Sequence, residues 1–478
     1  MFRTTFLGHQ SWLLGAGDTQ LLIDPLLEAG AGELERYWVH IHPPRRFDFD
    51  ALAPVHAVVL SHEHPDHFHV PSLLRLDREI PIVLSSLSSD AARDFLRSEG
   101  FVVVALEPGS CLRFGELELF GLQPDGRTAA HELDVVPLVV RDAGGHGSFF
   151  SSVDLSLTPA MAREALVHAP RPGVWTVPNN DLDMSAFCEW LEPIADQSAL
   201  RAADWARDLE RCLGPHRPEI VLVYGGGFAF TGSLESLNRR IFNCDSARAA
   251  AVLAERLPGL RCHAVEPGET VVMKDGRVAA VEGPRGFVTT PPRGEWPLRS
   301  ASNAPAPLPR PSTGRERLSD EERRALPALL DRLGEYLSAA PELAALDALP
   351  KAARDPVFCL WLREDDGASA FVLDRRRAAF RKETVPSDPR ERYLLGVECW
   401  ASDLVAVLEL ECSPDYVVLG HMKFWNFEPR RARVELDMLF YLYGHPLRQP
   451  DRYRRLYAAQ GARPVPAEER VRGPLSRA

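Results

Sequence analysis

The sequence predicts an α/β layered domain followed by a smaller α+β domain, and three observations support this division. Over residues 1–288, short apolar runs of strand length alternate with turn signals and amphipathic stretches. Residues 289–314 are rich in Pro, Ser and Ala, a composition that buries no core and favours an extended linker. The remaining residues, 315–478, are numerous enough for an accessory domain, whose role the sequence does not indicate.

In the first domain, nine runs have strand length, and several of them end in polar residues, which places chemistry at strand ends. They are residues 19–25, 56–62, 80–86, 101–109, 116–126, 135–145, 147–155, 173–180 and 219–227. The amphipathic pattern predicts helices within residues 70–79, 88–100, 159–170 and 244–259.

In the second domain, a helix is expected to begin at Ser319, because Glu322 stands at capping-box spacing from it. The apolar runs that follow suggest strands mixed with helices, and they are residues 356–364, 368–374, 404–411, 415–425 and 432–444.

The composition excludes several function classes. The chain has 478 residues, with 55 Lys and Arg against 67 Asp and Glu, and it has no long basic run, which argues against a nucleic-acid partner. No signal-peptide pattern and no run of about 18 apolar residues is present, so we expect a cytoplasmic protein without a membrane partner. The eight cysteines form no C-x-x-C pair, which argues against a zinc ribbon or a disulfide framework.

The most informative stretch is "LSHEHPDHFH", residues 60–69, directly after an apolar run. Five of the 15 histidines fall within residues 56–69, and they are His56, His62, His64, His67 and His69. Zn²⁺ and Fe²⁺ need several N and O ligands that converge on one point. Alternating His62 and His64 can face one point while Asp66 and His67 turn toward a neighbouring one, so two adjacent metal positions are possible. A surface loop with accidental histidines is the alternative.

The pattern H-x-H-x-D-H resembles the signature of the metallo-β-lactamase superfamily. Three further stretches are similar to other motifs of that superfamily and occur in the same order: "LLIDPLL" with Asp24, "AAHELD" with His131 and "SSVDLS" with Asp154. The resemblance covers residues 1–285 and implies an αββα sandwich.

The resemblance also implies a set of metal ligands. His62, His64 and His131 would hold one metal, whereas Asp66, His67 and Asp154 would hold or approach a second. Asp24 would contact a ligand histidine on the side of its ring that faces away from the metal. His9, in "LGHQSWLL", is similar to a histidine often found at this position, with either a structural role or a role near the metal.

The sequence departs from the superfamily at the fifth motif, where many members carry a histidine after a late strand. Tyr224 stands near that position, and His263 is the late histidine that offers an alternative. Asn180 and Asp181 follow another strand and either line the site or serve as turn and cap residues.

Within the superfamily, the sequence resembles most the metallo-β-lactamase-like domain of CMP-N-acetylneuraminate hydroxylases, which also lacks a recognisable fifth-motif histidine. The Rieske iron–sulfur motifs of those hydroxylases do not occur in these residues. We therefore expect an external electron donor.

Three functions fit these patterns. The first is a non-haem iron oxygenase, with one or two Fe, that hydroxylates or otherwise oxidises a small molecule. The second is a zinc-dependent hydrolase, in which Asp66 positions the metal-bound water or accepts its proton. The third is a binding protein with a structural metal, against which the second carboxylate cluster argues. We favour the oxygenase, with Asp66, Asp154 and Tyr224 as candidate catalytic residues.

Overall fold

The computed structural model describes most of the chain. The described residues are 1–33, 37–125, 133–180, 185, 187–188, 195–214, 216–239, 242, 244–284, 286–296, 308–344, 346, 354–384, 388–409, 411–412, 414–418, 420–427, 436–462 and 471–473.

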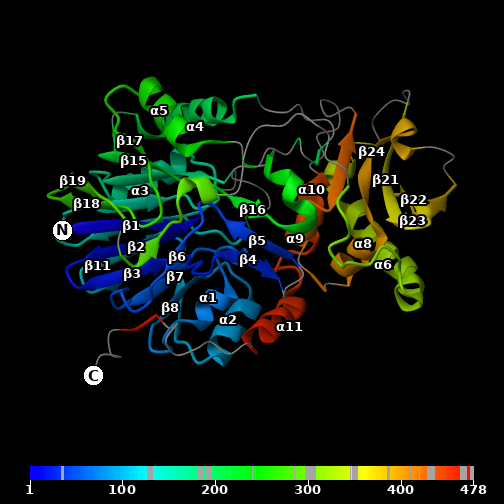
Figure 1. Ribbon diagram of the computed structural model, residues 1–478, viewed down its shortest axis with the longest axis horizontal. Coiled ribbons are helices and arrows are strands. Elements are labelled where there is room, and N and C mark those ends of the chain that lie inside the picture. Colours follow the sequence, from blue (N-terminus) through cyan, green and yellow to red (C-terminus); the bar gives the residue numbers. More distant parts are fainter. Residues whose placement is uncertain are drawn as a thin grey trace.

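Two β-sheets stack face to face in the N-terminal part of the molecule (Figure 1). The first sheet has the order β19 (Arg277–Glu282), β18 (Thr270–Lys274), β1 (Phe2–Gly8), β2 (Ser11–Ala16), β3 (Thr19–Ile23), β7 (Ala57–Leu60), β8 (Ile82–Ser85) and β9 (Val103–Leu106). The second sheet has the order β10 (Cys111–Phe114), β11 (Leu117–Gly121), β12 (Leu138–Asp142), β13 (Ser148–Ser151), β14 (Val174–Asn179), β15 (Ile220–Gly225) and β17 (Cys262–Ala264). Their inner faces share one apolar core, in which the rings of Trp12 and Phe149 lie 5.2 Å apart.

Helices cover the outer face of each sheet. Below the first sheet in Figure 1 lie α1 (Val70–Leu74) and α2 (Asp90–Ser98), whose Leu73 and Phe95 pack in one cluster with Leu22 and Val58. Against the second sheet lie α3 (Pro159–His168), α4 (Gln197–Leu213) and α5 (Ser246–Arg256). The predicted αββα sandwich is therefore confirmed. Helix α4, which the sequence reasoning did not predict, turns Ala202, Trp205, Ala206 and Leu209 toward the core.

Two small sheets border the sandwich. One has the order β16 (Phe228–Phe230), β5 (Tyr37–Ile41) and β4 (Gly30–Glu33), and the other pairs β20 (Val288–Thr289) with β6 (Arg46–Phe47). Short 3₁₀ turns are η2 (Gly232–Arg239), η3 (Arg293–Glu295) and η5 (Pro389–Glu391).

The C-terminal part is built around one mixed sheet, as the α+β prediction requires. Its order is β23 (Ala379–Glu383), β22 (Gly367–Asp374), β21 (Asp355–Glu364), β24 (Tyr393–Trp400) and β25 (Met422–Asn426). The helices are α6 (Asp320–Ala339), α7 (Pro341–Ala344), α8 (Ala401–Leu408), α9 (Pro414–Val418), α10 (Leu436–Tyr443) and α11 (Pro450–Gly461). The capping box at the start of α6 is present, because Ser319 and Glu322 each accept a hydrogen bond from the other's backbone N–H.

The end of the chain returns to the N-terminal sandwich. The ring of Tyr457 on α11 lies 4.9 Å from that of Phe68 and 5.5 Å from that of Phe95 on α2, and Val471 bridges to Leu76. Figure 1 shows α11 beside α2. Residues 297–307, the middle of the predicted linker, lie outside the described residues, so the domain boundaries stay predictions.

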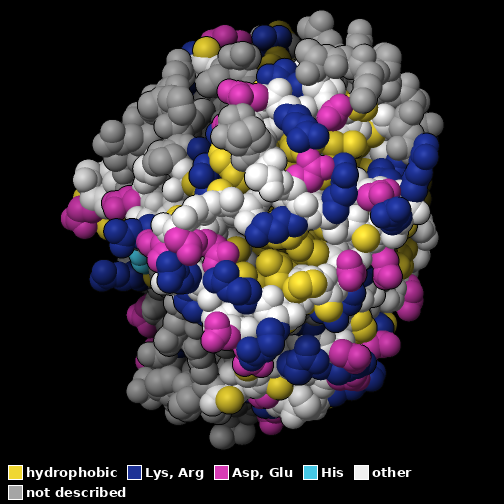
Figure 2. All heavy atoms as spheres, turned by 90° about the vertical axis from the view of Figure 1, so that its right-hand side faces the viewer, with side chains coloured by type: hydrophobic (Ala, Val, Ile, Leu, Met, Phe, Trp, Pro, Cys, Tyr) yellow, Lys and Arg dark blue, Asp and Glu magenta, His cyan; other side chains and the backbone are white. Residues whose placement is uncertain are grey.

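The face of the C-terminal part seen in Figure 2 carries Lys and Arg interspersed with Asp and Glu, without a field of one sign. Ion pairs of the C-terminal part include Arg317 with Asp365, 2.6 Å, and Arg323 with Glu364, 2.7 Å. Among the described residues, no helix combines the length and the apolar character that crossing a bilayer requires.

Candidate metal centre

The histidine-rich loop after β7 brings three donor atoms together with Asp154. The Oδ2 atom of Asp154 lies 3.4 Å from Nε2 of His62, 3.2 Å from Nε2 of His67 and 3.7 Å from Nδ1 of His64. His62 and His67 are fully buried. In the described part of the chain, His62, His67 and Asp154 form a group whose ligand atoms could hold one metal ion.

The spacing of these atoms fits a metal. Two donor atoms that each lie about 2.1 Å from one ion in a tetrahedral arrangement are about 3.4 Å apart. The distances of 3.4 and 3.2 Å from Asp154 to the two histidines match this edge. Imidazole and carboxylate together are the donor set that suits Fe²⁺ and Zn²⁺.

Asp24 and Ser61 orient both histidines from behind. Asp24 Oδ1 accepts from the backbone N–H of Ser61 at 2.8 Å, and its Oδ2 accepts from the Ser61 hydroxyl at 2.7 Å. Nδ1 of His67 lies 2.9 Å from the same Oδ2, and Nδ1 of His62 lies 2.9 Å from Ser61 Oγ. Because a carboxylate only accepts and the Ser61 proton is already donated to it, both Nδ1 atoms must carry protons. Both Nε2 lone pairs of the neutral imidazoles then point toward Asp154.

The carboxylates around His67 favour a positive charge at this point. Burial by itself would lower the pKa of His67, but Asp154, Asp66 and Asp24 raise it well above its ordinary value. Burial would likewise raise the pKa of Asp154, whereas His67 and the hydrogen bonds from the histidines hold it well below its ordinary value. The site therefore stabilises a cation, which a proton or a metal ion can supply.

A chain of hydrogen bonds links Tyr224 to Asp154. The Tyr224 hydroxyl donates to Oε1 of Gln10, and Nε2 of Gln10 donates to Asp154 Oδ1 at 2.7 Å. Burial, and then the charge of Asp154, raise the pKa of Tyr224 above its ordinary value. Tyr224 is therefore a neutral donor that acts on Asp154 through Gln10.

Asp66 lies beside the converging atoms and pairs with His9. Nε2 of His9 is 2.6 Å from Asp66 Oδ2, which lies 3.7 Å from Nε2 of His67. Burial would raise the pKa of Asp66, but His67 and His9 lower it far below its ordinary value. His9 adopts a left-handed φ of 55° and stacks on Phe228 at 4.9 Å. Asp66 is thus held ionised at the edge of the centre.

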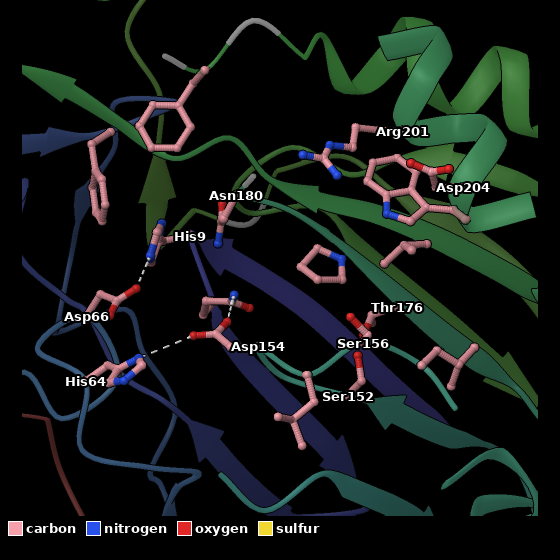
Figure 3. A pocket seen from close by; sticks show the side chains of 18 of the residues that line it. His9, His64, Asp66, Ser152, Asp154, Ser156, Thr176, Asn180, Arg201 and Asp204 are labelled. Atoms are coloured by element: carbon pink, nitrogen blue, oxygen red, sulfur yellow. Dashed lines mark hydrogen bonds and ion pairs between the residues drawn. The ribbon is translucent and has the colours of Figure 1, made fainter. Parts of the chain in front are cut away.

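A cavity of about 560 Å³ opens onto this centre. Figure 3 shows His9, His64, Asp66 and Asp154 on one side and Arg201 and Asp204 of α4 on the other. Its aromatic lining residues are Trp175, Trp205, Phe228, Phe242 and Tyr441. Pockets of this size and character hold small molecules.

The remaining predicted site residues have other positions. His131 and Asp181 lie outside the described residues. Asn180 borders the cavity, and its Oδ1 accepts from the backbone N–H groups of Gly226 and Gly227, both at 3.0 Å, so it holds the glycine turn. His263 pairs with Glu269 at 3.0 Å and is not part of the cavity wall.

Sequence reasoning missed several residues around the centre. They are Gln10, Ser61, Asp134, Tyr441 and His445. Ser61 and Asp134 adjoin the recognised motifs, which is a signal that could have found them. No local pattern marks Tyr441, which lies 377 residues from its partner His64.

Comparison with known proteins finds similarity in the N-terminal part of the chain. Residues 19–178 match the model of the beta-lactamase superfamily domain. Over 87 residues, the chain is 32% identical to the cytidine monophosphate-N-acetylneuraminic acid hydroxylase of Danio rerio. That match spans 18% of this chain and 14% of the hydroxylase.

Solved structures similar to this chain include both oxidising and hydrolysing proteins. CmlA, a diiron β-hydroxylase from Streptomyces venezuelae, is 19% identical with a TM-score of 0.37, covering 56% of this chain and 53% of CmlA. The isothiocyanate hydrolase from Delia radicum gut bacteria is 16% identical with a TM-score of 0.39, covering 57% of this chain and 99% of that protein.

Proposed function

Since residues 19–178 match the beta-lactamase superfamily domain, we propose that the chain is a non-haem iron oxygenase that hydroxylates or otherwise oxidises a small molecule. The observation that carries the proposal is the convergence of two imidazole nitrogens, from His62 and His67, with one carboxylate oxygen, from Asp154. Two histidines and one carboxylate, with open positions left over, are the donor set typical of non-haem Fe²⁺ oxygenases.

Each neighbouring residue has a defined task in this proposal. His62, His67 and Asp154 hold the metal, and Nδ1 of His64, 3.7 Å from Asp154 Oδ2, is placed to join them as a further ligand. Iron bound there would supply the redox chemistry of dioxygen. Asp24 fixes the tautomer of His67, and Gln10 occupies the second oxygen of Asp154, so that Oδ2 stays turned toward the histidines.

The cavity supports a small substrate with an apolar body. Trp175, Trp205 and Phe228 offer flat aromatic surfaces, whereas Thr176 and Arg201 offer polar contacts at the wall. These rings exclude water from the cavity, so a bound substrate lies in a dry environment next to Asp66 and Asp154.

A zinc-dependent hydrolase is the second candidate, and a specific observation favours it. Asp66 stays ionised at the edge of the centre despite its burial, where its carboxylate would accept a hydrogen bond from a zinc-bound water and position it. The short match to a hydroxylase supports the first candidate instead.

The test begins with metal analysis of the full chain, expressed in iron-replete medium and purified without chelators. Oxygen uptake is then measured with a reductant and a panel of apolar small molecules. Hydrolysis of ester, lactam and phosphodiester probes is measured in parallel on the zinc-loaded protein.

Asp154→Asn should lose metal and turnover. Asp142→Asn is the matched control, because Asp142 is also buried but accepts hydrogen bonds from Gly144 and His146 in a turn. Iron with substrate-dependent oxygen uptake supports the oxygenase, and zinc with hydrolysis alone replaces it by the second candidate. A wild-type protein that binds no metal contradicts both.

A further inference from the structure

Helices α10 and α11 both contact the metal loop, at His64 and at Glu63. Tyr441, on α10, places its hydroxyl 2.9 Å from Nε2 of His64. The ring of His64 meets the ring of Tyr441 edge-on, at 5.4 Å and 85°. His64 is 7% exposed, and Tyr441 is half-buried at the wall of the cavity.

The two nitrogens of His64 have different neighbours, and a metal bound at Nδ1 would set the direction of the hydrogen bond at Nε2. Nδ1 faces Asp154 Oδ2 at 3.7 Å, next to the converging donor atoms. If Nδ1 presents its lone pair there, the proton of the neutral ring must sit on Nε2. Nε2–H then donates to the Tyr441 hydroxyl oxygen. In this arrangement the Tyr441 hydroxyl accepts from Nε2–H and supports the tautomer in which Nδ1 is available to a metal.

A second contact from the same segment reaches the backbone of the loop. His445 Nδ1 accepts from the backbone N–H of Leu447 at 3.2 Å, so the proton of its neutral ring is on Nε2. That Nε2 lies 3.5 Å from Asp134 Oδ1. Asp134 Oδ2 in turn accepts from the backbone N–H of Glu63 at 2.8 Å. The buried carboxylate of Asp134 therefore joins the segment to the loop.

A third contact comes from α11. The Tyr457 hydroxyl donates to Oε1 of Glu63 at 3.1 Å, and its ring packs on Phe68. Glu63 and His64 are consecutive, so the loop is held through both side chains and through one backbone amide.

We propose that residues 436–461 are part of the active site and that Tyr441 is a positioning residue for the ligand His64. The inference rests on the metal centre assigned above. It gives the C-terminal part of the chain a role, which is to keep His64 in the orientation and tautomer that bind metal. Because Tyr441 and Met438 also line the cavity, the helix that orients His64 is the helix that a substrate would touch.

The test compares Tyr441→Phe with the matched control Tyr443→Phe in the full chain. Both residues lie on α10, but Tyr443 contacts Tyr336, at 5.2 Å between rings. Metal is removed and Zn²⁺ affinity is measured by competition with a chromogenic chelator. Co²⁺ is then loaded, and its visible absorption spectrum is recorded as a readout of ligand geometry.

Tyr441→Phe should weaken Zn²⁺ binding by about 10-fold or more, the usual effect of removing an outer partner of a metal ligand. It should also change the Co²⁺ spectrum, whereas Tyr443→Phe should leave both unchanged. Tyr441→Phe with wild-type Zn²⁺ affinity and an unchanged Co²⁺ spectrum would overturn the inference while leaving the proposed function intact. A wild-type chain that binds neither ion would overturn the proposed function as well.

Discussion

Replacing Asp24 by Asn tests the orientation of the metal ligands most directly. Asp24 is buried and adopts a left-handed φ of 43°, a conformation that Asn tolerates, so the backbone should survive the change. The amide oxygen can keep the hydrogen bond from the backbone of Ser61. The amide nitrogen then faces the Ser61 hydroxyl and Nδ1 of His67, which both now lack an acceptor.

The expected losses of Zn²⁺ affinity and of unfolding free energy follow from this change in hydrogen bonding. When the amide donates to Nδ1 of His67, the imidazole proton moves to Nε2 and points at the metal position. Zn²⁺ affinity should fall by about 10-fold to 100-fold, which corresponds to about 1.4–2.7 kcal/mol. Loss of a hydrogen bond to a charged group should lower the free energy of unfolding of the metal-free protein by about 1.5–3 kcal/mol.

The assay is Zn²⁺ competition with a chromogenic chelator, together with urea unfolding of the metal-free chain. Asp275→Asn is a matched control, because Asp275 also has a left-handed φ, of 53°, but is exposed and pairs with His146. If Asp24→Asn binds Zn²⁺ like the wild type, the tautomer argument is refuted.

Three further predictions concern stability. Burial raises the pKa of Asp403 to about 6 from 3.8, so the native state holds this proton more tightly than the unfolded chain. The protonated group therefore stabilises the fold at low pH, and about 3 kcal/mol of the wild type's unfolding free energy is lost as the pH rises from about 4 to above 6. Asp403→Asn lacks this titration, so its unfolding free energy should rise relative to that of the wild type by the same amount over this pH range. A difference between the two proteins that does not change with pH would contradict the prediction. Gly8→Ala places a Cβ 2.4 Å from the buried Arg45, at a φ of 104°, and should lower the free energy of unfolding by about 1–3 kcal/mol in a denaturant titration. The control Gly100→Ala has a φ of 89° but no atom within 4 Å of the new Cβ, so it should lower the free energy of unfolding by less. Equal losses in the two variants would show that the contact with Arg45 does not matter. Zn²⁺ at a hundredfold excess over its Kd should stabilise the wild type by about 2.7 kcal/mol in thermal melts, reversed by a chelator, and Asp154→Asn should show no such shift.

Local patterns predicted much of the fold. The capping box at Ser319 and Glu322 is present, and the alternating apolar runs form the strands of both stacked sheets. Helix α4 was not predicted, although its buried Trp205, Leu209 and Cys212 recur at helical spacing, a local signal that could have found it. Its Trp205 borders the cavity only because the helix packs beside the second sheet.

The sequence alone indicated a candidate metal site, because His62, His64, Asp66 and His67 lie within one short loop after a strand. A tight loop brings such neighbours to one place whatever the rest of the chain does. Asp154, from a later motif, lies beside them, with Oδ2 3.2 Å from Nε2 of His67.

Only the tertiary structure decided which partners orient these ligands. Gln10 meets Tyr224 from 214 residues away, and His64 meets Tyr441 from 377 residues away. Contacts at such separations depend on how sheets and helices pack, and packing leaves no periodic trace in the residues that make contact. Candidate ligands could therefore be predicted from the sequence. The groups that orient them come from distant parts of the chain and are found only in the folded structure.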